Sequence, residues 1–399
     1  MEYLKKFSLF DSTLYFYPLS YFEKNIIEFS NSLNPKITII IPVYNEVLYT
    51  LNCLKSLSIN IDYKNVEIII INDNSTDETL KFLNKIKGIK IITNIENQGF
   101  LKNINIGIKE AKSEYVLILN NDVLVFPNFL ESLLDVFDNK ESVGAVGSML
   151  IYENLELQEA GCEIDNLGNA KNIGRTENPN TPEYNYLKKV DYCSGCSLLF
   201  KKYLPNNEII QLDEYFLPAY YEETDMCLNL KYNFKLNTYY QPLSKIIHFE
   251  SISYSKENSE KKNKLIQTNK IKFLSKWKEK LVKSSDSLEN QIFIFENTTN
   301  FDTDIVYDKI ITLKNENKNI IYLTDSYKIN SFHVKLQQSE IPVLYNYMRN
   351  YGKKITLKRN IKNNKSKTNS LIFVKKNGIS FYYILKISLF NLKIRFNFL

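Results

Sequence analysis

The sequence predicts an α/β fold, with a mostly parallel, doubly wound sheet in its first half and a small α/β segment in its second half. Two observations lead to this prediction. Between residues 37 and 119, short apolar runs rich in β-branched residues alternate with segments of helical character. Beyond residue 290, a similar alternation begins again. A β-α-β-α order implies parallel strands joined by right-handed crossovers, with helices on both faces of the sheet.

The first four strands are predicted from short apolar runs that end at turn-forming residues. They are expected at residues 37–41, 67–71, 90–93 and 115–119. Helices are expected between them at residues 49–57, 79–87 and 100–112. The second helix follows Ser75-Thr-Asp-Glu78, whose spacing matches a capping box. Ligands of such sheets bind beyond the carboxyl ends of the strands, and Asp73 and Asp122 follow two of these ends.

The later elements follow a less regular pattern. Strands are expected at residues 196–201, 237–241, 291–295 and 319–323, and a short helix at 223–232. A longer helix is expected at residues 266–282, and its predicted buried face carries Ile266, Ile271, Leu274 and Trp277. Residues 390–398 alternate strictly between apolar and polar side chains, which predicts a half-buried strand.

The composition excludes several classes of protein. The chain has 399 residues, of which 44% are hydrophobic and 24% charged, as in ordinary globular proteins of about two domains. Its net charge is +6, but twelve of the 51 Lys and Arg residues lie in residues 351–399, which contain no Asp or Glu. The preceding part is therefore mildly acidic, with 39 bases against 45 acids. Because a mildly acidic chain lacks the excess positive charge that binds nucleic acid, we expect no nucleic-acid partner.

The sequence also bears on the compartment of the protein. Five scattered cysteines are too few for a disulfide framework, and Cys193-Ser-Gly-Cys196 lacks the second Cys or His pair of a zinc site. The first residues lack a signal peptide, because Asp11 interrupts their apolar stretch and no cleavage site follows. No apolar run approaches the ~20 residues that a membrane-spanning helix needs. We therefore expect a cytoplasmic protein.

Five motifs occur in one order at the ends of the predicted elements. They are Pro42-Val-Tyr-Asn-Glu46, Asn72-Asp-Asn-Ser-Thr-Asp77, Asn97-Gln-Gly-Phe100 with Asn103, Asn105 and Gly107, Leu119-Asn-Asn-Asp-Val123, and Glu222-Glu-Thr-Asp225. Over residues 36–255 the sequence resembles glycosyltransferase family 2, and is similar to its rhamnosyltransferase-like bacterial branch. The resemblance implies the GT-A fold, which is Rossmann-like. It also implies inverting transfer of a sugar from a UDP- or dTDP-type donor to a hydroxyl of a surface-polysaccharide or glycolipid acceptor.

The resemblance suggests how the chain is divided. We expect an N-terminal extension at 1–35, a GT-A catalytic domain at 36–285, a truncated α/β module at 286–350, and a basic tail with a terminal strand at 351–399. Residues 291–345 faintly resemble the start of a family 4 (GT-B) glycosyltransferase, which we interpret as a non-catalytic remnant or docking module. The tail could hold the protein at the inner face of an anionic membrane. The alternative is a solvated basic face.

The resemblance places one group of residues around the nucleotide. These residues are Pro42, Tyr44, Glu46, Asp73, Asn97, Gly99, Asn103 and Asn121. A carboxylate such as that of Asp73 can accept a hydrogen bond from the imide N–H of uracil or thymine. The alternative is a turn or capping role for Asp73, although Ser75 already fits the cap.

A second group is implied at a metal ion. Asn120-Asn121-Asp122 stands where the family carries its Asp-x-Asp motif, with Asn120 in place of the first Asp. The resemblance implies that Asp122, Asn120 and His248 hold Mg²⁺ or Mn²⁺ together with diphosphate oxygens, because hard cations share ligands with phosphates. Such an ion stabilises charge on the leaving group. The alternatives are an Asn-rich turn and a structural histidine.

Acids at the head of a predicted helix are implied as the catalytic group. Glu222-Glu-Thr-Asp225 aligns with the family's Glu-Asp motif, which makes Glu223 the general base, supported by Glu222 and Asp225. Neighbouring carboxylates raise one another's pKa and a helix N-terminus lowers it, so that one acid can be poised as a base. The alternative is ordinary capping of a helix by acids.

The acceptor side is implied by Asp191-Tyr-Cys-Ser-Gly-Cys196, which resembles a small-residue strand of the family. Ser194 and Gly195 would let a sugar approach the backbone closely. The alternative is a bulge in a core strand.

The leading hypothesis is a glycosyltransferase with a nucleotide-sugar donor and a glycan or lipid-linked glycan acceptor. A nucleotidyltransferase would need a Gly-rich, basic loop after the first strand and a dehydrogenase a G-x-G-x-x-G motif, and Pro42–Glu46 has neither. A catalytically degenerate scaffold remains an alternative, because Asn120 and Glu223 depart from the family pattern.

Overall fold

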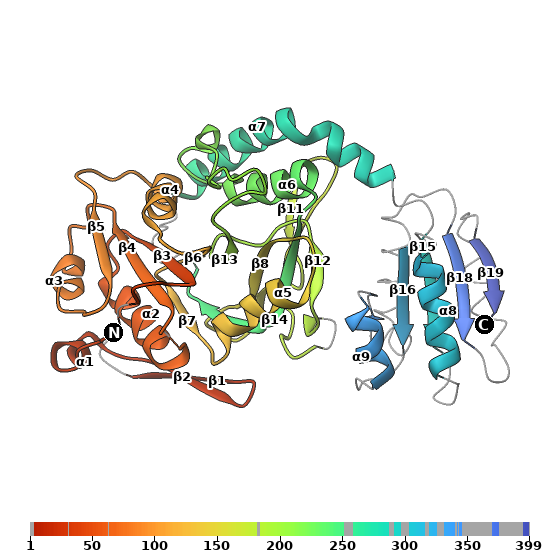
Figure 1. Ribbon diagram of the computed structural model, residues 1–399, viewed down its shortest axis with the longest axis horizontal. Coiled ribbons are helices and arrows are strands. Elements are labelled where there is room, and N and C mark those ends of the chain that lie inside the picture. The colour runs from red at the N-terminus through yellow and green to blue at the C-terminus, as the bar shows by residue number, and fades with distance from the viewer. Residues whose placement is uncertain are drawn as a thin grey trace. The chain divides into compact units, whose positions relative to one another are not determined.

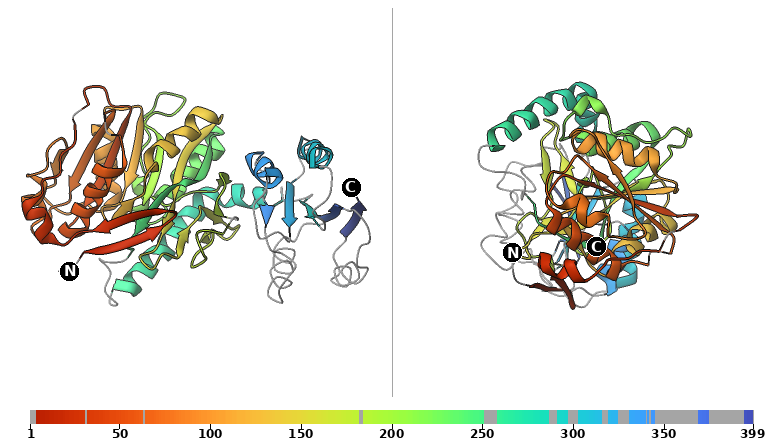
Figure 2. Two further views of the ribbon diagram at one scale, coloured as in Figure 1. Left: turned by 90° about the horizontal axis from the view of Figure 1, so that it is seen from below. Right: turned by 90° about the vertical axis from the view of Figure 1, so that its left-hand side faces the viewer.

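The computed structural model forms two compact units. The described residues are 4–30, 32–62, 64–181, 184–250, 258–286, 291–296, 303–315, 319–324, 331–339, 341, 343–344, 369–374 and 394–398. The first unit comprises Met1–Asn180 and Lys188–Lys278, and the second comprises Thr181–Leu187 and Glu279–Leu399. Each unit has a β-sheet of its own (Figures 1 and 2). The predicted division of the chain into four parts stays a prediction.

The first unit is built on a sheet of ten described strands, one half of which is parallel (Figure 1). The parallel half contains β3 (Ile37–Val43), β4 (Val66–Asn72), β5 (Lys90–Thr93) and β6 (Tyr115–Leu119). Their order across the sheet is β6-β3-β4-β5. β3, β4 and β6 are almost wholly buried, as expected of parallel strands covered on both faces. The four predicted strands and the α/β class are confirmed.

The helices between these strands are α2 (Val47–Asn60), α3 (Thr79–Leu83) and α4 (Phe100–Glu110). The predicted helices at α2 and α4 are confirmed, whereas α3 ends at Leu83 rather than at Lys87. The predicted capping box was wrong. Ser75 Oγ instead accepts a hydrogen bond from the Asn45 backbone N–H (2.8 Å), and Asp77 accepts one from the Thr79 N–H (2.9 Å). Ser75 therefore binds the neighbouring loop instead of the helix.

The other half of the sheet is mixed. β8 (Val143–Ile151) lies between β13 (Ser197–Lys201), with which it is antiparallel, and β14 (Asn237–His248), with which it is parallel. The remaining elements of this region are β7 (Val123–Val125), α5 (Phe129–Asn139), β9 (Leu157–Glu159), β10 (Cys162–Ile164), β11 (Ala170–Asn172), β12 (Lys188–Val190), the 3₁₀ turn η2 (Glu214–Phe216) and α6 (Glu222–Phe234). The predicted strands at 196–201 and 237–241 and the helix at 223–232 are confirmed.

The N-terminal residues form a hairpin that packs on the first unit. β1 (Lys5–Leu9) and β2 (Ser12–Phe16) pair antiparallel as a separate ribbon (Figures 1 and 2), and α1 (Leu19–Lys24) follows. The ring of Phe16 contacts those of Tyr49 and Phe249, at centroid distances of 5.1 and 5.2 Å. The sequence has no clear period here, yet aromatic packing makes the hairpin part of the core.

Helix α7 (Asn258–Asp286) follows the sheet of the first unit. The helix is confirmed, but its predicted buried face was partly wrong, because Ile271 is 71% exposed. The buried positions are Asn269, Phe273, Trp277 and Leu281, which are spaced by four residues. The apolar pattern misplaced the buried face because one of the buried residues, Asn269, is polar. None of the helices in the described ranges has both the length and the apolar character needed to cross a membrane.

The second unit contains a parallel sheet in the order β17-β16-β15-β18-β19. Its elements are β15 (Gln291–Glu296), α8 (Thr303–Asn315), β16 (Asn319–Thr324), α9 (Ser331–Gln338), β17 (Val343–Leu344), β18 (Asn369–Val374) and β19 (Ile394–Phe398). The predicted strands at 291–295 and 319–323 are confirmed. Residues 394–398 of the predicted terminal strand are in a strand, and residues 390–393 lie outside the described residues, as does most of the basic tail.

Candidate active site

The loops that follow β3 and β4 are joined through Asn45. Its backbone N–H donates to Ser75 Oγ (2.8 Å), and its side-chain Oδ1 accepts from the backbone N–H groups of Thr76 (2.7 Å) and Asp77 (3.3 Å). Asn45 and Glu46 have left-handed backbones, with φ of 57° and 59°. Asn tolerates this conformation better than most residues because its side chain can bond locally. The hydrogen bonds therefore fix the turn that ends β3.

Three of the predicted nucleotide-binding residues lie at this turn. Tyr44 is 51% exposed, so its ring is accessible to a ligand. Pro42 is partly buried at the end of β3. Burial raises the pKa of Glu46, and the charges of Asp77 and Asp122 raise it further. The carboxyl group of Glu46 therefore interacts electrostatically with Asp77 and Asp122.

Asp73, in contrast, is buried and faces the protein. It is 2% exposed, and its carboxylate accepts hydrogen bonds from Asn94 Nδ2 (2.7 Å) and from the backbone N–H groups of Gln98 (2.8 Å) and Gly99 (2.9 Å). Asn94 also donates to Asn103 Oδ1 (2.7 Å). Asp73 and Asn103 thus hold the start of α4 in this structure.

The other two predicted nucleotide contacts have different surroundings. Asn97 is exposed just before α4. Asn121 donates from Nδ2 to Thr50 Oγ1 (2.9 Å), and its side chain is therefore directed toward α2. Asn97 is free to meet a ligand from solvent, whereas Asn121 ties the loop after β6 to its neighbouring helix.

The predicted metal-binding residues meet at the imidazole of His248. Asp122 Oδ1 lies 3.3 Å from His248 Nε2, and Asn120 Nδ2 lies 3.4 Å from the same nitrogen. The other ring nitrogen, Nδ1, lies 3.0 Å from Oε1 of Gln158, which is 4% exposed. The Phe249 N–H donates to the Asp122 carbonyl oxygen (3.0 Å) beyond the antiparallel pairing of β7 with β14. The sheet thus brings together residues that are 126 positions apart.

These residues fit a divalent cation. When Nδ1–H of His248 donates to Gln158, the lone pair of Nε2 faces Asp122, as a metal ligand requires. Adjacent ligands of one Mg²⁺ ion at ~2.1 Å stand about 3 Å apart, close to the 3.3 Å between Asp122 and His248. Without an ion, burial lowers the pKa of His248, but the charges of Cys196 and Asp122 outweigh it and hold the pKa well above the usual value.

The protein supplies only part of a coordination shell. In the described part of the chain, no cluster of three His, Cys, Asp or Glu side chains could hold an ion. Asp122 and His248 therefore need further oxygen ligands from elsewhere, and diphosphate oxygens are of the type that hard cations prefer.

The glutamates of the predicted base lie in the first turn of α6. Glu222 is 4% exposed, and its Oε2 has no hydrogen-bond partner. Burial raises the pKa of both Glu222 and Glu223, and the charge of Glu223 raises that of Glu222 further. Hydrogen bonding from the Gly195 backbone N–H partly offsets the effect of burial on the pKa of Glu223. A raised pKa makes a carboxylate a better proton acceptor.

Asp225 has a different set of partners from those predicted. Its carboxylate accepts hydrogen bonds from Trp277 Nε1 (2.7 Å) and Lys276 Nζ (2.8 Å), both on α7. The structure therefore directs Asp225 toward α7 and away from the two glutamates. Sequence alone could not show this, since α7 begins more than thirty residues later.

Glu159 is a site residue that sequence reasoning missed. It is 1% exposed and accepts hydrogen bonds from the Ser194 backbone N–H (3.0 Å) and from Asn172 Nδ2 (3.1 Å). Burial raises its pKa to about 7, a rise that the hydrogen bond from Ser194 limits and the charge of Glu223 supports. An acid directly before Ala160-Gly161, in a stretch without clear period, carries no signal of burial.

The two small residues of the predicted acceptor side lie between these acids. The Ser194 N–H binds Glu159, and the Gly195 N–H stabilises the charge of Glu223. A Cβ atom at Gly195 would meet the ring of Phe100 at 3.5 Å and Glu223 Cβ at 3.8 Å. Gly195 therefore lies between Phe100 at the start of α4 and Glu223 at the start of α6.

Contacts connect Asp73 with Glu223. Asp73 binds the N–H of Gly99 at the start of α4, and Phe100, the next residue, lies beside Gly195. Gly195 in turn faces Glu223. The loop after β4 and the start of α6 are thus linked through the start of α4 and Gly195.

Electrostatic interactions also link the surroundings of Glu223 with those of Asp122. The charge of Glu223 raises the pKa of Glu159, and His248 acts on the same carboxyl group in the opposite direction. His248 contacts Asp122 directly. The Asn120 N–H also donates to the carbonyl oxygen of Cys196 (3.0 Å), the residue after Gly195, so these acids lie in one region of the first unit.

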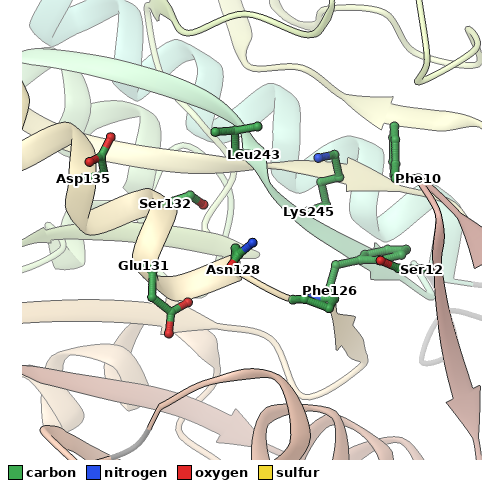
Figure 3. Close-up of a pocket in the computed structure, with 10 residues that line it drawn as sticks. Phe10, Ser12, Phe126, Asn128, Glu131, Ser132, Asp135, Leu243 and Lys245 are labelled. Atoms are coloured by element: carbon green, nitrogen blue, oxygen red, sulfur yellow. The ribbon is translucent and has the colours of Figure 1, made fainter.

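A cavity of about 520 Å³ lies elsewhere in the first unit (Figure 3). It is lined by Phe10, Ser12, Phe126, Pro127, Asn128, Glu131, Ser132, Asp135, Leu243 and Lys245. Lys245 Nζ lies over the Phe10 ring, 4.6 Å from its centroid. The cavity contains none of the predicted site residues, since it opens at the far end of β7 from Asp122.

Part of the chain is similar to known proteins. Residues 38–206 match the family described as glycosyl transferase family 2. An uncharacterized glycosyltransferase of Haemophilus influenzae is 36% identical over 120 residues, which are 29% of this chain and 37% of the relative. The glycosyltransferase GlyG of Streptococcus pneumoniae is 27% identical over 121 residues, or 29% and 40% of the two chains. Over these residues the chain is therefore similar to glycosyltransferases.

This chain is thus similar to family 2 glycosyltransferases over residues 38–206. It spans about two fifths of the length of the first curated relatives that it matches. Among solved structures, a mannosyltransferase of Pyrobaculum calidifontis in complex with GDP-Man and Mn²⁺ has a TM-score of 0.40 and 14% identity, covering 59% of this chain and 63% of the other. Staphylococcus aureus TarS (residues 1–349) has a TM-score of 0.37 and 21% identity, with coverage of 52% and 60%.

Proposed function

We propose that the first unit is an inverting, metal-dependent glycosyltransferase. It would move a hexosyl or rhamnosyl group from a UDP- or dTDP-type nucleotide sugar to a hydroxyl of a surface-polysaccharide or glycolipid acceptor. One observation carries the proposal: Asp122 and His248, which suit a cation, lie in the same region as Glu223, which suits a base. Sugar transfer needs both functions beside one another.

The donor side is formed by the turns after β3, β4 and β6. The accessible ring of Tyr44 provides a surface on which a base can stack. Asp122, Asn120 and His248 would hold Mg²⁺ or Mn²⁺ against the diphosphate of the donor. When bound, the ion neutralises charge on the departing diphosphate. Asp73 supports this side through the start of α4, and its buried carboxylate argues against direct contact with the base.

The acceptor side is formed by Glu223 and by the turn at Ser194 and Gly195. In an inverting reaction, the acceptor hydroxyl oxygen bonds to the anomeric carbon on the face opposite the diphosphate. The bond between that carbon and the diphosphate oxygen breaks, and the hydroxyl proton passes to the Glu223 carboxylate. Burial of Glu223 favours this proton transfer because it raises the pKa of the acid.

Turnover tests the proposal directly. Hydrolysis of UDP-, GDP- and dTDP-sugars with Mn²⁺ should proceed with one donor class in the wild type. Asp122→Ala and Glu223→Gln should each slow it by at least 100-fold, as expected when a metal ligand or a general base is removed.

A degenerate scaffold is the second candidate, because Asn120 offers an amide where the family has a carboxylate. On this reading, the wild type would be as inert as both variants with all three donor classes. Such a result would contradict the transferase proposal.

The setting of the reaction is also a proposal. A nucleotide-sugar donor implies the cytoplasm, and lipid-linked acceptors imply the inner face of the membrane. The basic residues at 351–399 would favour anionic lipids, but this segment lies largely outside the described residues, so the membrane contact stays a prediction.

A further inference from the structure

Helix α7 packs one face against the segment that leads into the candidate base. Asn269, Phe273, Lys276 and Trp277 recur at intervals of three and four residues, which places them on one side of the helix. Asn269 and Phe273 are fully buried, and Trp277 is 5% exposed. All four contact residues 213–225, which comprise the loop before α6 and its first turn. We call residues 213–225 the base segment.

Asn269 binds the backbone of the base segment. Its Nδ2 lies within hydrogen-bonding distance of the carbonyl oxygens of Phe216 (2.7 Å), Ala219 (2.8 Å) and Tyr220 (3.1 Å), which share its two N–H groups. One buried side-chain amide thus binds three backbone carbonyl groups of a loop that pairs with no strand. Buried carbonyls without a donor are costly, so Asn269 stabilises this particular course of the loop.

The turn that Asn269 holds is strained. Tyr220 and Tyr221 both have φ of 76°, a conformation that bulky residues adopt only when their surroundings impose it. Phe273 packs against the Tyr221 ring at a centroid distance of 5.0 Å, and Tyr221 Oη donates to the Gly168 carbonyl (2.9 Å). Glu222 and Glu223 follow this turn directly, so the backbone of the turn sets the positions of both side chains.

Lys276 and Trp277 hold the other end of the base segment. Trp277 Nε1 donates to Asp225 Oδ1 (2.7 Å), and Lys276 Nζ binds both Asp225 (2.8 Å) and Asp213 (2.8 Å). The ammonium group of Lys276 therefore connects the first and last residues of the segment. It also pairs with Asp225, the acid of the first turn of α6 that is directed toward α7.

We propose that Asn269, Lys276 and Trp277 are positioning residues of the transfer reaction, which hold the base segment so that Glu223 faces the acceptor. The inference rests on the proposed function. It extends the candidate site from the base segment to helix α7. A misplacement of about 1 Å at a catalytic group can cost ~100-fold in rate, so contacts of this kind bear on turnover.

The test uses full-length protein with two variants. Trp277→Phe keeps the ring and removes the donor to Asp225, and Lys276→Met keeps the aliphatic stem and removes the ammonium group. Ile271→Ala is the matched control, because Ile271 lies on the same helix but is 71% exposed. Lys276→Arg restores the charge and tests for rescue.

Donor hydrolysis with Mn²⁺ should show a split between kcat and KM. In Trp277→Phe and Lys276→Met, kcat should fall about 10- to 100-fold, while KM for the nucleotide sugar stays within about twofold, because the donor turns are untouched. Ile271→Ala should match the wild type, and Lys276→Arg should recover most of the rate. Unchanged kcat in both folded variants would overturn the inference, as would equal effects on kcat and on nucleotide affinity.

Hydrogen exchange separates this inference from the proposed function. Backbone amides of residues 221–226 should exchange at least about tenfold faster in Trp277→Phe than in the wild type, because the variant loses a hydrogen bond to a charged group. This readout does not depend on turnover. An inactive wild type would contradict the proposed function. Equal exchange rates in Trp277→Phe and the wild type would contradict the positioning role of Trp277.

Discussion

Two buried carboxylates share one turn of backbone at the candidate site. The consecutive N–H groups of Ser194 and Gly195 serve Glu159 and Glu223, respectively. Burial raises the pKa of both acids, and the charge of Glu223 raises that of Glu159 further. Glu159 accordingly exchanges its proton near neutral pH, at a pKa of about 7.

This property of Glu159 predicts how stability depends on pH. Its pKa rises from 4.5 in the unfolded chain to about 7 in the folded state, so the folded state holds a proton that the unfolded state has lost. The free energy of unfolding therefore falls as pH rises from 4.5 to 7, by ~3 kcal/mol, and levels off above pH 7. Glu159→Gln should lack this component in urea unfolding measured between pH 4.5 and 8.

Glu163→Gln is a suitable control, since Glu163 is exposed on β10 nearby. It should keep the pH dependence of the wild type. Parallel pH profiles for Glu159→Gln and the wild type would show that Glu159 titrates in the folded state as it does in the unfolded chain.

Single residues also show where prediction from the sequence ends. The end of β4 correctly placed Asp73 at the edge of the sheet, but its partners Asn94 and Gly99 belong to a later loop. Ser75 fits a capping box by spacing and bonds to Asn45 instead. Spacing along the chain therefore suggests possible hydrogen-bond partners, but contacts between distant loops determine which of them form.

At the scale of elements, two strands supply the candidate cation site and a third supports it. Asp122 precedes β7, His248 ends β14, and Gln158 of β9 holds the ring of His248. Gln158 Nε2 in turn donates to Glu250 Oε2 (3.1 Å). Gln158 thus has both ends of its amide engaged, which fixes the orientation of the imidazole.

Loss of this support should weaken metal binding. Gln158→Leu removes the acceptor for His248 Nδ1, and affinity for Mn²⁺ should fall about 10- to 100-fold, as is usual when such a partner is lost. Calorimetric titration with Mn²⁺ measures this without turnover. Gln211→Leu, at an exposed position, should bind like the wild type. Unaltered affinity in Gln158→Leu would place the cation away from His248.

Helices and strands were predicted well where one face or both faces are apolar. β3, β4 and β6 consist of continuous apolar runs, and α2 and α4 lie between them. α7 was predicted as a helix, but its buried face was not, because Asn269 is fully buried and Ile271 is exposed. Periodicity locates a helix, whereas a buried amide is recognised only once its three carbonyl partners are in place.

At the scale of the molecule, the N-terminal hairpin is part of the first unit. Phe16 is 1% exposed and lies between Tyr49 of α2 and Phe249, the residue after β14. Phe16→Ala should lower the free energy of unfolding of this unit by about 3–5 kcal/mol, the usual cost of removing a buried ring. Urea unfolding measures the effect. Tyr15→Ala should cost far less, because Tyr15 is 42% exposed on the same strand.

An equal effect of Phe16→Ala and Tyr15→Ala would contradict this role of the hairpin. The aromatic-rich residues 1–35 have no period that would predict the packing. The ring of Phe16 owes its burial to residues that follow it by 33 and 233 positions. Such contacts depend on the completed sheet, and no local pattern encodes them.

The pairing of β7 with β14 has a consequence for how the site is assembled. His248 lies opposite Val123, the residue after Asp122, in a ladder of backbone hydrogen bonds. The two side chains are therefore ordered by folding itself, before any ligand arrives, and binding incurs little further loss of conformational entropy. The same rigidity leaves little tolerance: one residue inserted within 123–125 would reverse the alternation of the strand and separate the pair.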